Sequence, residues 1–333
     1  MLNHPKYKVA LIGATGLVGR NVLKLMMADK EQWEISAFAS KFSNLVIDDH
    51  LFNVYPVDCA NFFDFDFCLF ATDEEVSKLW IEKALHAGAR VVDSSSWRRL
   101  DPFVPLIVPG VNHNTLKEED QLCSHSNCIV SPLACVLNPL CTMYGLKSVH
   151  ISTYQSVSGA GNKGVEACVL ETQSKLSGEH VNTYYFPKSI GFNVIPHIGT
   201  LNEDGQSSEE EKIQKELQRI LKVDCPIFSF AVRVPVLKGH ASAVWVELER
   251  AYSLQDIKSA WSHASHVEVS QDYKTSEEMQ GQVVVSVGRI RQLTPYCLSV
   301  WVCSDNTLRG AACDMVDIAK IMANQGMQKS LKL

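Results

Sequence analysis

The sequence predicts an α/β protein with two domains: a Rossmann-like domain on a parallel sheet, and an α+β domain with a mostly antiparallel sheet. Three observations support this prediction. A strand, a glycine turn and a helix open the chain, strand and helix patterns then alternate as far as Pro109, and closely spaced alternating strands follow from Val149. We place the first domain at residues 1–127, completed by a C-terminal helix at 307–333, and the second at 128–306.

The composition is that of an ordinary soluble protein, with 46% hydrophobic and 20% charged residues in 333. The net charge of -6 is spread among interspersed acids and bases, which disfavours a nucleic-acid or membrane surface and leaves small molecules as the expected partners. No apolar run approaches the roughly 20 residues of a membrane span. We therefore expect a cytoplasmic protein.

The eleven cysteines are irregularly spaced and form no C-x-x-C, so reduced thiols fit better than a disulfide framework or a zinc ribbon. His263 and His266 form an H-x-x-H, but no cysteine or carboxylate is spaced to complete a metal site. We expect no bound metal.

The N-terminal segment has the features of a dinucleotide-binding turn. Residues 8–12 read as a buried strand that leads directly into Gly13-Ala-Thr-Gly16-Leu-Val-Gly19 and an amphipathic helix at 20–28. Glycines at this spacing let backbone amides at a helix N-terminus approach a pyrophosphate. A capping turn without a ligand is the alternative. If the turn binds a cofactor, its contacts are expected from Gly13, Thr15, Gly16, Leu17 and Val18.

The second strand, at 33–39, ends in Ser40-Lys41-Phe42-Ser43. In a doubly wound fold this strand end meets the adenosine ribose. No acidic residue is present there to bind both ribose hydroxyls, whereas Ser40 and Lys41 can bind a 2′-phosphate. The sequence therefore favours NADP over NAD.

Further elements continue the alternation. We expect strands at 65–71, 90–93 and 106–109, and a helix that ends at His86 and is capped by Asp73-Glu74-Glu75. The loop 94–99 is rich in hydroxyls and ends in Arg98-Arg99, which suits a phosphate or carboxylate, although an exposed turn would look the same.

The second half predicts strands at 150–158, 228–236, 243–249 and 282–290. The segments between these strands look too short to hold helices that would join parallel strands. We therefore expect an antiparallel sheet with an apolar face free to pack against helices or another subunit. The last segment, from Ser304 to Met322, begins with a capping signature and continues as an amphipathic helix that can return to the first domain.

Cys128 stands after a polar connection, in Ser126-Asn127-Cys128-Ile129-Val130-Ser131-Pro132. We expect Ser131 to cap the following helix and Pro132 to occupy its first position, so that Cys128 lies just ahead of the helix. The unpaired amides there favour a thiolate. The alternative is a buried structural cysteine, which is the commoner role of a free thiol.

Seven motifs in order resemble the aspartate-semialdehyde dehydrogenase family over some 300 residues. They are the turn Gly13–Gly19, Asn127-Cys128, Tyr154–Gly161, Phe192–Pro196, Glu209–Lys212, Arg233–His240 and Ser304–Ala312. The resemblance implies NADPH-dependent conversion of aspartyl phosphate to aspartate semialdehyde, which feeds lysine, diaminopimelate, threonine and methionine synthesis. It also implies that the second domain is catalytic and mediates a homodimer or homotetramer.

The resemblance assigns roles to matching positions. The catalytic residues would be Cys128 as nucleophile, His240 as general acid/base and Gln155 as the residue that orients the acyl intermediate. The substrate residues would be Arg233 for the α-carboxylate, Arg99 and Lys212 for the phosphate, Glu209 near the amine, and Asn127. Ser158, Gly159 and Asn306 would join the cofactor site. Glu209 and Lys212 are expected on one face of a helix capped by Ser207 or Ser208.

The chain departs from the family pattern near the cysteine and the cofactor. The departures are Ile129-Val130, Phe42, Ser94, Gly110 and Ala71-Thr-Asp-Glu74. Two other functions stay open: a related reductase, such as one acting on N-acetylglutamyl phosphate, and a catalytically silent paralogue that binds a nucleotide or a partner protein.

Overall fold

The chain forms two compact units in a computed structural model that describes residues 6–183 and 185–330. The first unit comprises Met1–Ser126 and Ala311–Leu333, and the second comprises Asn127–Gly310. The ends of the predicted first domain, residues 1–5 and 331–333, lie outside the described residues.

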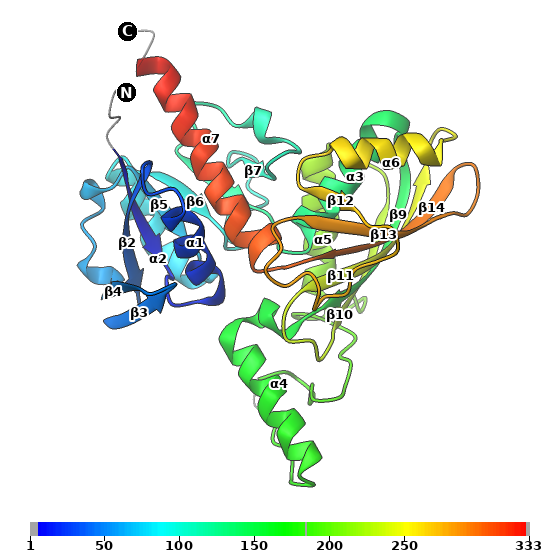
Figure 1. Cartoon of the computed structure of the whole chain (residues 1–333), viewed down its shortest axis with the longest axis horizontal. Coiled ribbons are helices and arrows are strands. Elements are labelled where there is room, and N and C mark those ends of the chain that lie inside the picture. The colour runs from blue at the N-terminus through cyan, green and yellow to red at the C-terminus, as the bar shows by residue number, and fades with distance from the viewer. Residues whose placement is uncertain (1–5, 184, 331–333) are drawn as a thin grey trace. The chain divides into compact units, whose positions relative to one another are not determined.

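The first unit is built on an eight-stranded sheet in the order β3-β4-β2-β1-β5-β6-β8-β7 (Figure 1). Its strands are β1 (Tyr7–Ile12), β2 (Trp33–Ala39), β3 (Ser43–Ile47), β4 (His50–Pro56), β5 (Phe67–Phe70), β6 (Arg90–Asp93), β7 (Leu106–Ile107) and β8 (Leu122–His125). All neighbours pair in parallel except β3 and β4. The predicted parallel sheet is confirmed, but the β3–β4 hairpin was not predicted.

The segment before Cys128 was wrongly expected to be only a polar connection, because it contains β8. All four β8 residues are buried. Ser124 donates its N–H to the Pro105 carbonyl at 2.8 Å, and His125 Nε2 lies 3.2 Å from the Asp314 carboxylate. Both polar residues are thus buried and bonded to distant parts of the chain, although Ser124 Oγ and His125 Nδ1 have no hydrogen-bond partner among the described residues. A buried strand with polar side chains is hidden from a hydrophobicity pattern.

Helices cover both faces of this sheet. On one face lie α1 (Leu17–Met27) and α7 (Cys313–Ser330), whose Met26 and Ile318 share a core with Leu11 of β1. On the other lies α2 (Glu74–His86), whose Ile81 packs with Ile12. Successive β1 side chains therefore face opposite cores, as a strand buried on both sides requires. Asp73 accepts the Val76 N–H at 3.0 Å, which confirms the predicted cap of α2.

The second unit contains a six-stranded sheet in the order β10-β9-β11-β14-β13-β12. Its strands are β9 (Leu146–Gln155), β10 (Ile227–Arg233), β11 (His240–Leu248), β12 (Val267–Val269), β13 (Val285–Gln292) and β14 (Cys297–Ser304). The three central pairings are antiparallel, while β9–β10 and β12–β13 are parallel.

The expectation that helical crossovers are absent from this unit was wrong. Two helices, α4 (Gly161–Leu176) and α5 (Ser208–Leu221), separate the parallel strands β9 and β10, and α6 (Leu254–His263) precedes β12. Parallel neighbours need a long connection, which is helical between β9 and β10 and, over the described residues 270–284, lacks a helix between β12 and β13. Both units also contain short 3₁₀ helices, at Val57–Cys59, Phe62–Asp64, His113–Thr115 and Val157–Ala160. An irregular turn at Leu308–Ala312 precedes α7.

One face of the six-stranded sheet is covered by α3 (Val130–Tyr144), α5 and α6, whereas the other is open. Trp261 of α6 is fully buried and donates its indole N–H to the Val136 carbonyl at 2.9 Å. On the open face Phe228 is 57%, Phe230 55% and Trp245 43% exposed.

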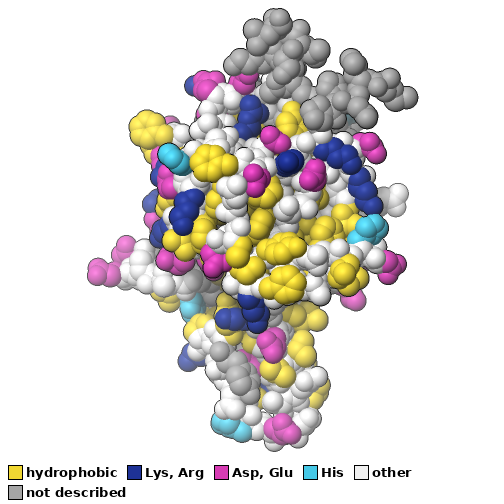
Figure 2. Space-filling model, turned by 90° about the vertical axis from the view of Figure 1, so that its left-hand side faces the viewer, with side chains coloured by type: hydrophobic (Ala, Val, Ile, Leu, Met, Phe, Trp, Pro, Cys, Tyr) yellow, Lys and Arg dark blue, Asp and Glu magenta, His cyan; other side chains and the backbone are white. Residues whose placement is uncertain are grey.

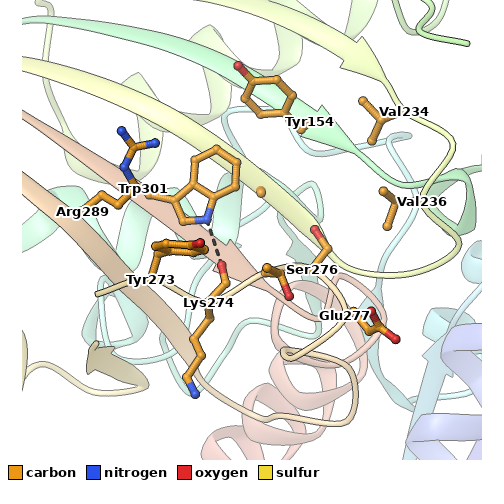
Figure 3. Close-up of a pocket in the computed structure, with 11 residues that line it drawn as sticks. Tyr154, Val234, Val236, Tyr273, Lys274, Ser276, Glu277, Arg289 and Trp301 are labelled. Carbon is orange, nitrogen blue, oxygen red and sulfur yellow. Dashed lines mark hydrogen bonds between the residues drawn. The ribbon is translucent and has the colours of Figure 1, made fainter. Parts of the chain in front are cut away.

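A pocket of about 730 Å³ opens in the second unit beside Tyr154 and Trp301 (Figure 3). The Trp301 indole N–H donates to the Lys274 carbonyl at 2.9 Å, and Tyr273 lies next to the indole. The pocket therefore has aromatic walls, of which Trp301 is held by the backbone of Lys274.

The surface shown in Figure 2 carries interspersed acidic and basic side chains, with hydrophobic ones among them. In the part of the chain that the structure describes, no helix is both long and apolar enough to cross a membrane. No cluster of three or more His, Cys, Asp or Glu suited to a metal ion occurs among these described residues. All eleven cysteines are free thiols.

Candidate active site

Polar residues from four strands meet at one edge of the six-stranded sheet. β9 ends at Gln155 and β10 at Arg233, and these two residues are register partners. β11 runs antiparallel to β9 and β14, so its first residue, His240, pairs with the last of β14, Ser304. This topology brings Gln155, Arg233 and His240 to the same edge.

The loop before α3 carries the half-buried Cys128. The Asn127 side-chain oxygen accepts the Ile129 N–H at 2.9 Å, and its carbonyl accepts the Val130 N–H at 2.9 Å. Cys128 thus lies just ahead of α3, as predicted.

The predicted cap of α3 was wrong. The helix begins at Val130 with Ile129 as its N-cap residue, and no side chain caps it. Ser131 and Pro132 occupy the second and third helical positions, because Asn127 already turns the chain before them. Pro132 still suits the first turn, where its missing N–H costs no intrahelical hydrogen bond.

His240 is buried and held in one orientation. The Ser156 backbone N–H donates to its Nδ1 at 3.1 Å. Because Nδ1 is the acceptor, the neutral ring carries its proton on Nε2, which is buried without a partner among the described residues. Burial, followed by the nearby charge of Arg233, lowers the pKa of His240 to about 3. The ring is therefore a neutral Nε2–H donor.

Arg233 is also buried, and its Nη1 donates to the Ser156 carbonyl at 2.7 Å. Burial lowers its pKa, and the charge of Glu209 opposes this shift. The guanidinium lines a pocket of about 390 Å³ together with Tyr185, Phe186 and other residues. A fixed cation in such a pocket is suited to a carboxylate.

Gln155 and Asn127 converge on α5. Asn127 Nδ2 donates to Glu209 Oε1 at 2.9 Å, and Gln155 Nε2 lies 3.4 Å from the same oxygen. Ser207 caps α5 in a capping box with Glu210, which confirms the predicted cap. Lys212 is half-buried one turn further along. Four of the five predicted substrate residues, Asn127, Glu209, Lys212 and Arg233, thus belong to the second unit.

The Asp305-Asn306 pair anchors the turn that leads into β11. Asn306 Oδ1 accepts the Gly239 N–H at 3.0 Å and the Ser158 hydroxyl at 3.1 Å. Asp305 is fully buried and lies 3.0 Å from the Lys238 ammonium. Asn306 and Ser158, predicted as cofactor residues, therefore also position the residue next to His240.

Ser156 is the functional residue that sequence reasoning missed. Its backbone carbonyl accepts from Arg233 and its backbone N–H donates to His240. Its side-chain hydroxyl also lies 3.0 Å from His240 Nδ1 and donates to Asn306 Oδ1 at 3.3 Å. The only sequence signal is its place directly after Gln155 within a shared motif. The two backbone contacts leave no mark on the side chain, and the hydroxyl contacts are to residues 84 and 150 positions away, which no local pattern reveals.

The glycine turn joins the ends of three strands in the first unit. The Gly13 N–H donates to the Phe38 carbonyl at 2.9 Å. Gly13 has φ +88°, and a Cβ there would lie 2.3 Å from the Ala71 carbonyl oxygen, so only glycine fits. Gly16 is the N-cap residue of α1, and Thr15, Leu17 and Val18 are half-buried around it. This tight turn at a helix N-terminus fits a dinucleotide pyrophosphate.

Ser40 and Lys41 are exposed directly after β2. Phe42, which follows them, makes an edge contact with the Tyr55 ring at 5.9 Å between centroids. Lys41 is thus the charged residue of the segment 40–43, and it is followed by a phenylalanine that packs on Tyr55.

Arg99 belongs to the first unit. It is buried and donates to the Ser94 carbonyl, while the neighbouring Arg98 forms an ion pair with Glu82 at 2.8 Å. The acidic pair Asp73-Glu74, a departure from the family pattern, has local structural partners: Asp73 caps α2, and Glu74 pairs with Lys78 at 2.7 Å.

The dinucleotide-type turn of the first unit is typical of a nicotinamide-dependent dehydrogenase, and the second unit brings a histidine and an arginine to one sheet edge in the unit that also carries Cys128. Comparisons with known families agree. The model "Semialdehyde dehydrogenase, NAD binding domain" matches residues 8–119, and "Semialdehyde dehydrogenase, dimerisation domain" matches residues 137–309.

Full-length relatives narrow this class. Aspartate-semialdehyde dehydrogenases of Rickettsia bellii and Rickettsia conorii are 37% identical to this chain, with 95% and 96% of it and 97% and 98% of those proteins aligned. A Vibrio cholerae aspartate semialdehyde dehydrogenase II, solved in complex with ASA, superposes with a TM-score of 0.92 at 28% identity, covering 96% of this chain and 99% of that one. The chain belongs to the aspartate-semialdehyde dehydrogenase family.

Proposed function

We propose that the protein catalyses the NADPH-dependent reductive dephosphorylation of L-aspartyl 4-phosphate to L-aspartate 4-semialdehyde through a thioester on Cys128. The observation that carries the proposal is the convergence of Gln155, Arg233 and His240 at one sheet edge, in a chain of this family. Cys128 would attack the acyl carbon and expel phosphate. A soft thiolate suits this step because a thioester forms readily and accepts hydride readily.

The cofactor would be held by the glycine turn, by Ser40 and Lys41, and by Ser158 and Gly159. Bound reduced nicotinamide supplies the hydride that converts the thioester to a hemithioacetal. Lys41 can bind a 2′-phosphate, and no acid follows β2 to bind the free ribose hydroxyls. These residues support NADP as the cofactor.

His240 would act as an Nε2–H donor to the acyl oxygen. The Ser156 N–H occupies Nδ1 at 3.1 Å, so the ring cannot take a proton there without losing that bond. This supports His240 as a hydrogen-bond donor that stabilises the developing hemithioacetal oxyanion through its Nε2–H, and the proton that finally neutralises this oxygen would come from solvent. Because the ring is neutral and its Nε2 already carries a proton, removal of the thiol proton by His240 is also unfavourable in this geometry. The proposal therefore keeps a hydrogen-bonding role for His240 in place of the acid/base role that the resemblance implies.

Arg233 would bind the α-carboxylate in the pocket of about 390 Å³. Arg99 and Lys212 would bind the phosphate, and Glu209 would face the substrate amine. The carboxylate of Glu209 already organises Asn127 and Gln155, so it would orient two substrate-site amides as well.

The protein would form a homodimer through the open face of the six-stranded sheet. The dimerisation-domain model covers these strands, and Phe228, Phe230 and Trp245 are exposed on the face. Burial of such aromatics is a large favourable term in association. Size-exclusion chromatography with light scattering of the native chain and of Trp245→Glu would test this.

The activity is tested by NADP reduction with aspartate semialdehyde and phosphate, in the native protein and in Cys128→Ala. We expect phosphate-dependent reduction that the substitution abolishes, and full activity in the control Cys141→Ala, a half-buried thiol on α3. N-acetylglutamate semialdehyde is run in parallel. Activity with that aldehyde alone would favour the related reductase, and no reduction with either by folded protein would favour the silent paralogue.

A further inference from the structure

Helix α5 holds the nucleophile loop at two points. Glu209 accepts the Asn127 side-chain amide at 2.9 Å, and Glu216 Oε2 accepts the Asn127 backbone N–H at 2.7 Å. The two glutamates are seven residues apart, which is two helical turns, so they lie on the same face of α5. Glu209 is 7% exposed and Glu216 is fully buried.

Asn127 in turn fixes the residues on either side of Cys128. Its side-chain oxygen accepts the Ile129 N–H, and its carbonyl accepts the N–H of Val130 and Ser131. The Glu216 contact fixes the Ser126–Asn127 peptide, and the acceptors of Asn127 fix the residues that follow Cys128. The cysteine is therefore held between an anchored residue and the start of a helix.

We propose that Glu216 is a positioning residue that fixes the Cys128 loop through the backbone N–H of Asn127. The proposal rests on the assignment of Cys128 as nucleophile. A carboxylate acceptor makes a shorter and stronger bond to a backbone N–H than a neutral acceptor does, and the bond is buried, where it is strengthened further. The contact does not involve the Asn127 side chain, so it would act whatever substrate the site binds.

The reactivity of the Cys128 thiol tests this role, because it can be measured without substrate or cofactor. The rate of Cys128 alkylation by iodoacetamide at neutral pH is measured by peptide mass spectrometry in the native protein and in Glu216→Ala. We expect the rate to fall at least about 5-fold, because a loosened loop no longer holds Cys128 in its place just ahead of α3. Glu216→Gln keeps an acceptor oxygen and is expected to stay within about 3-fold of the native rate.

Glu211→Ala is the matched control. Glu211 lies on the same helix, is exposed, and pairs with Lys215. It should leave both alkylation and activity unchanged. In the enzyme assay, Glu216→Ala should lower kcat by about 30- to 100-fold with KM within about 2-fold, since a misplacement near 1 Å costs about that much in rate.

Native alkylation and kcat in folded Glu216→Ala would overturn the proposal. If that variant does not fold, Glu216→Asp replaces it, because the shorter side chain keeps the charge but draws the acceptor away from Asn127. Native alkylation in folded Glu216→Asp would then overturn it. Since alkylation needs no substrate, a native protein that lacks the proposed activity leaves this comparison intact.

Discussion

The substitution Gly159→Ala is expected to damage the active site more than the stability of the fold. Gly159 lies in the turn Val157–Ala160, and a Cβ there would be 2.8 Å from Arg233 Nη1 and 3.0 Å from His240 Nε2. Neither atom can yield freely. The Ser156 carbonyl holds Nη1 at 2.7 Å, and the Ser156 N–H holds the imidazole ring at 3.1 Å.

The magnitude follows from these distances. Ordinary van der Waals separation requires each group to move by several tenths of an ångström to about 1 Å, and a displacement of that size costs about 100-fold in rate, or about 2.7 kcal/mol of transition-state stabilisation. Overpacking costs about 1–3 kcal/mol of folding free energy. We therefore expect kcat/KM to fall about 100-fold in a variant that remains folded.

The assay is steady-state kinetics together with a thermal melt. Gly178→Ala is the control, because Gly178 has φ +70° and open space around its Cβ position. It should lose stability through backbone strain while keeping its kcat/KM. A folded Gly159→Ala protein with kcat/KM within about 3-fold of native would refute the reasoning.

Three further outcomes are expected. Arg233→Lys should lower kcat/KM about 100-fold, mainly through KM, because lysine lacks the planar fork; an unchanged KM would count against carboxylate binding at this position. Phe42→Arg should lower the Kd for NADPH about 5- to 10-fold with little change for NADH, measured by fluorescence titration, and equal gains for both cofactors would contradict the assignment of this strand end to the 2′-phosphate. The unfolding free energy should fall as pH drops below about 6.5, by up to about 1.4 kcal/mol per pH unit, because the unfolded His240 binds a proton that the folded ring, with its pKa lowered to about 3, does not. His240→Asn should lack this part of the pH dependence in melts at several pH values, and an identical slope in both proteins would contradict it.

Sequence patterns predicted helices and strands best where neighbouring residues alone determine the local structure. The strand at 33–39, the helix capped by Asp73 and the helix capped by Ser207 were all found, because apolar runs and capping residues act locally. β8 was missed because Ser124 and His125 are buried by long-range partners that no local pattern reveals. The α3 cap failed for a related reason: Asn127 turns the chain earlier than Ser131 could.

The residues of the candidate site likewise divide into those that the sequence reveals and those that it does not. Cys128, Gln155, Arg233 and His240 are recognisable from motif order, and the register of β9, β10, β11 and β14 accounts for why the last three meet. Ser156 and Glu216 were not recognisable as site residues. Ser156 acts through its backbone and through a hydroxyl whose partners, His240 and Asn306, are far away in the sequence. Glu216 accepts from a backbone N–H, and an acidic residue on a charged helix looks like a solvated one until its burial is known.

A single-turnover experiment tests the central claim most directly. The native enzyme is mixed with excess aspartate semialdehyde and NADP in the absence of phosphate, and NADPH formation and intact protein mass are followed together. The account predicts a burst of about one NADPH per active site and an added aspartyl group on Cys128, both absent from Cys128→Ala; added phosphate should remove the aspartyl group and allow NADPH formation to continue. A burst without any adduct on Cys128, or an adduct on another cysteine, would contradict the thioester mechanism.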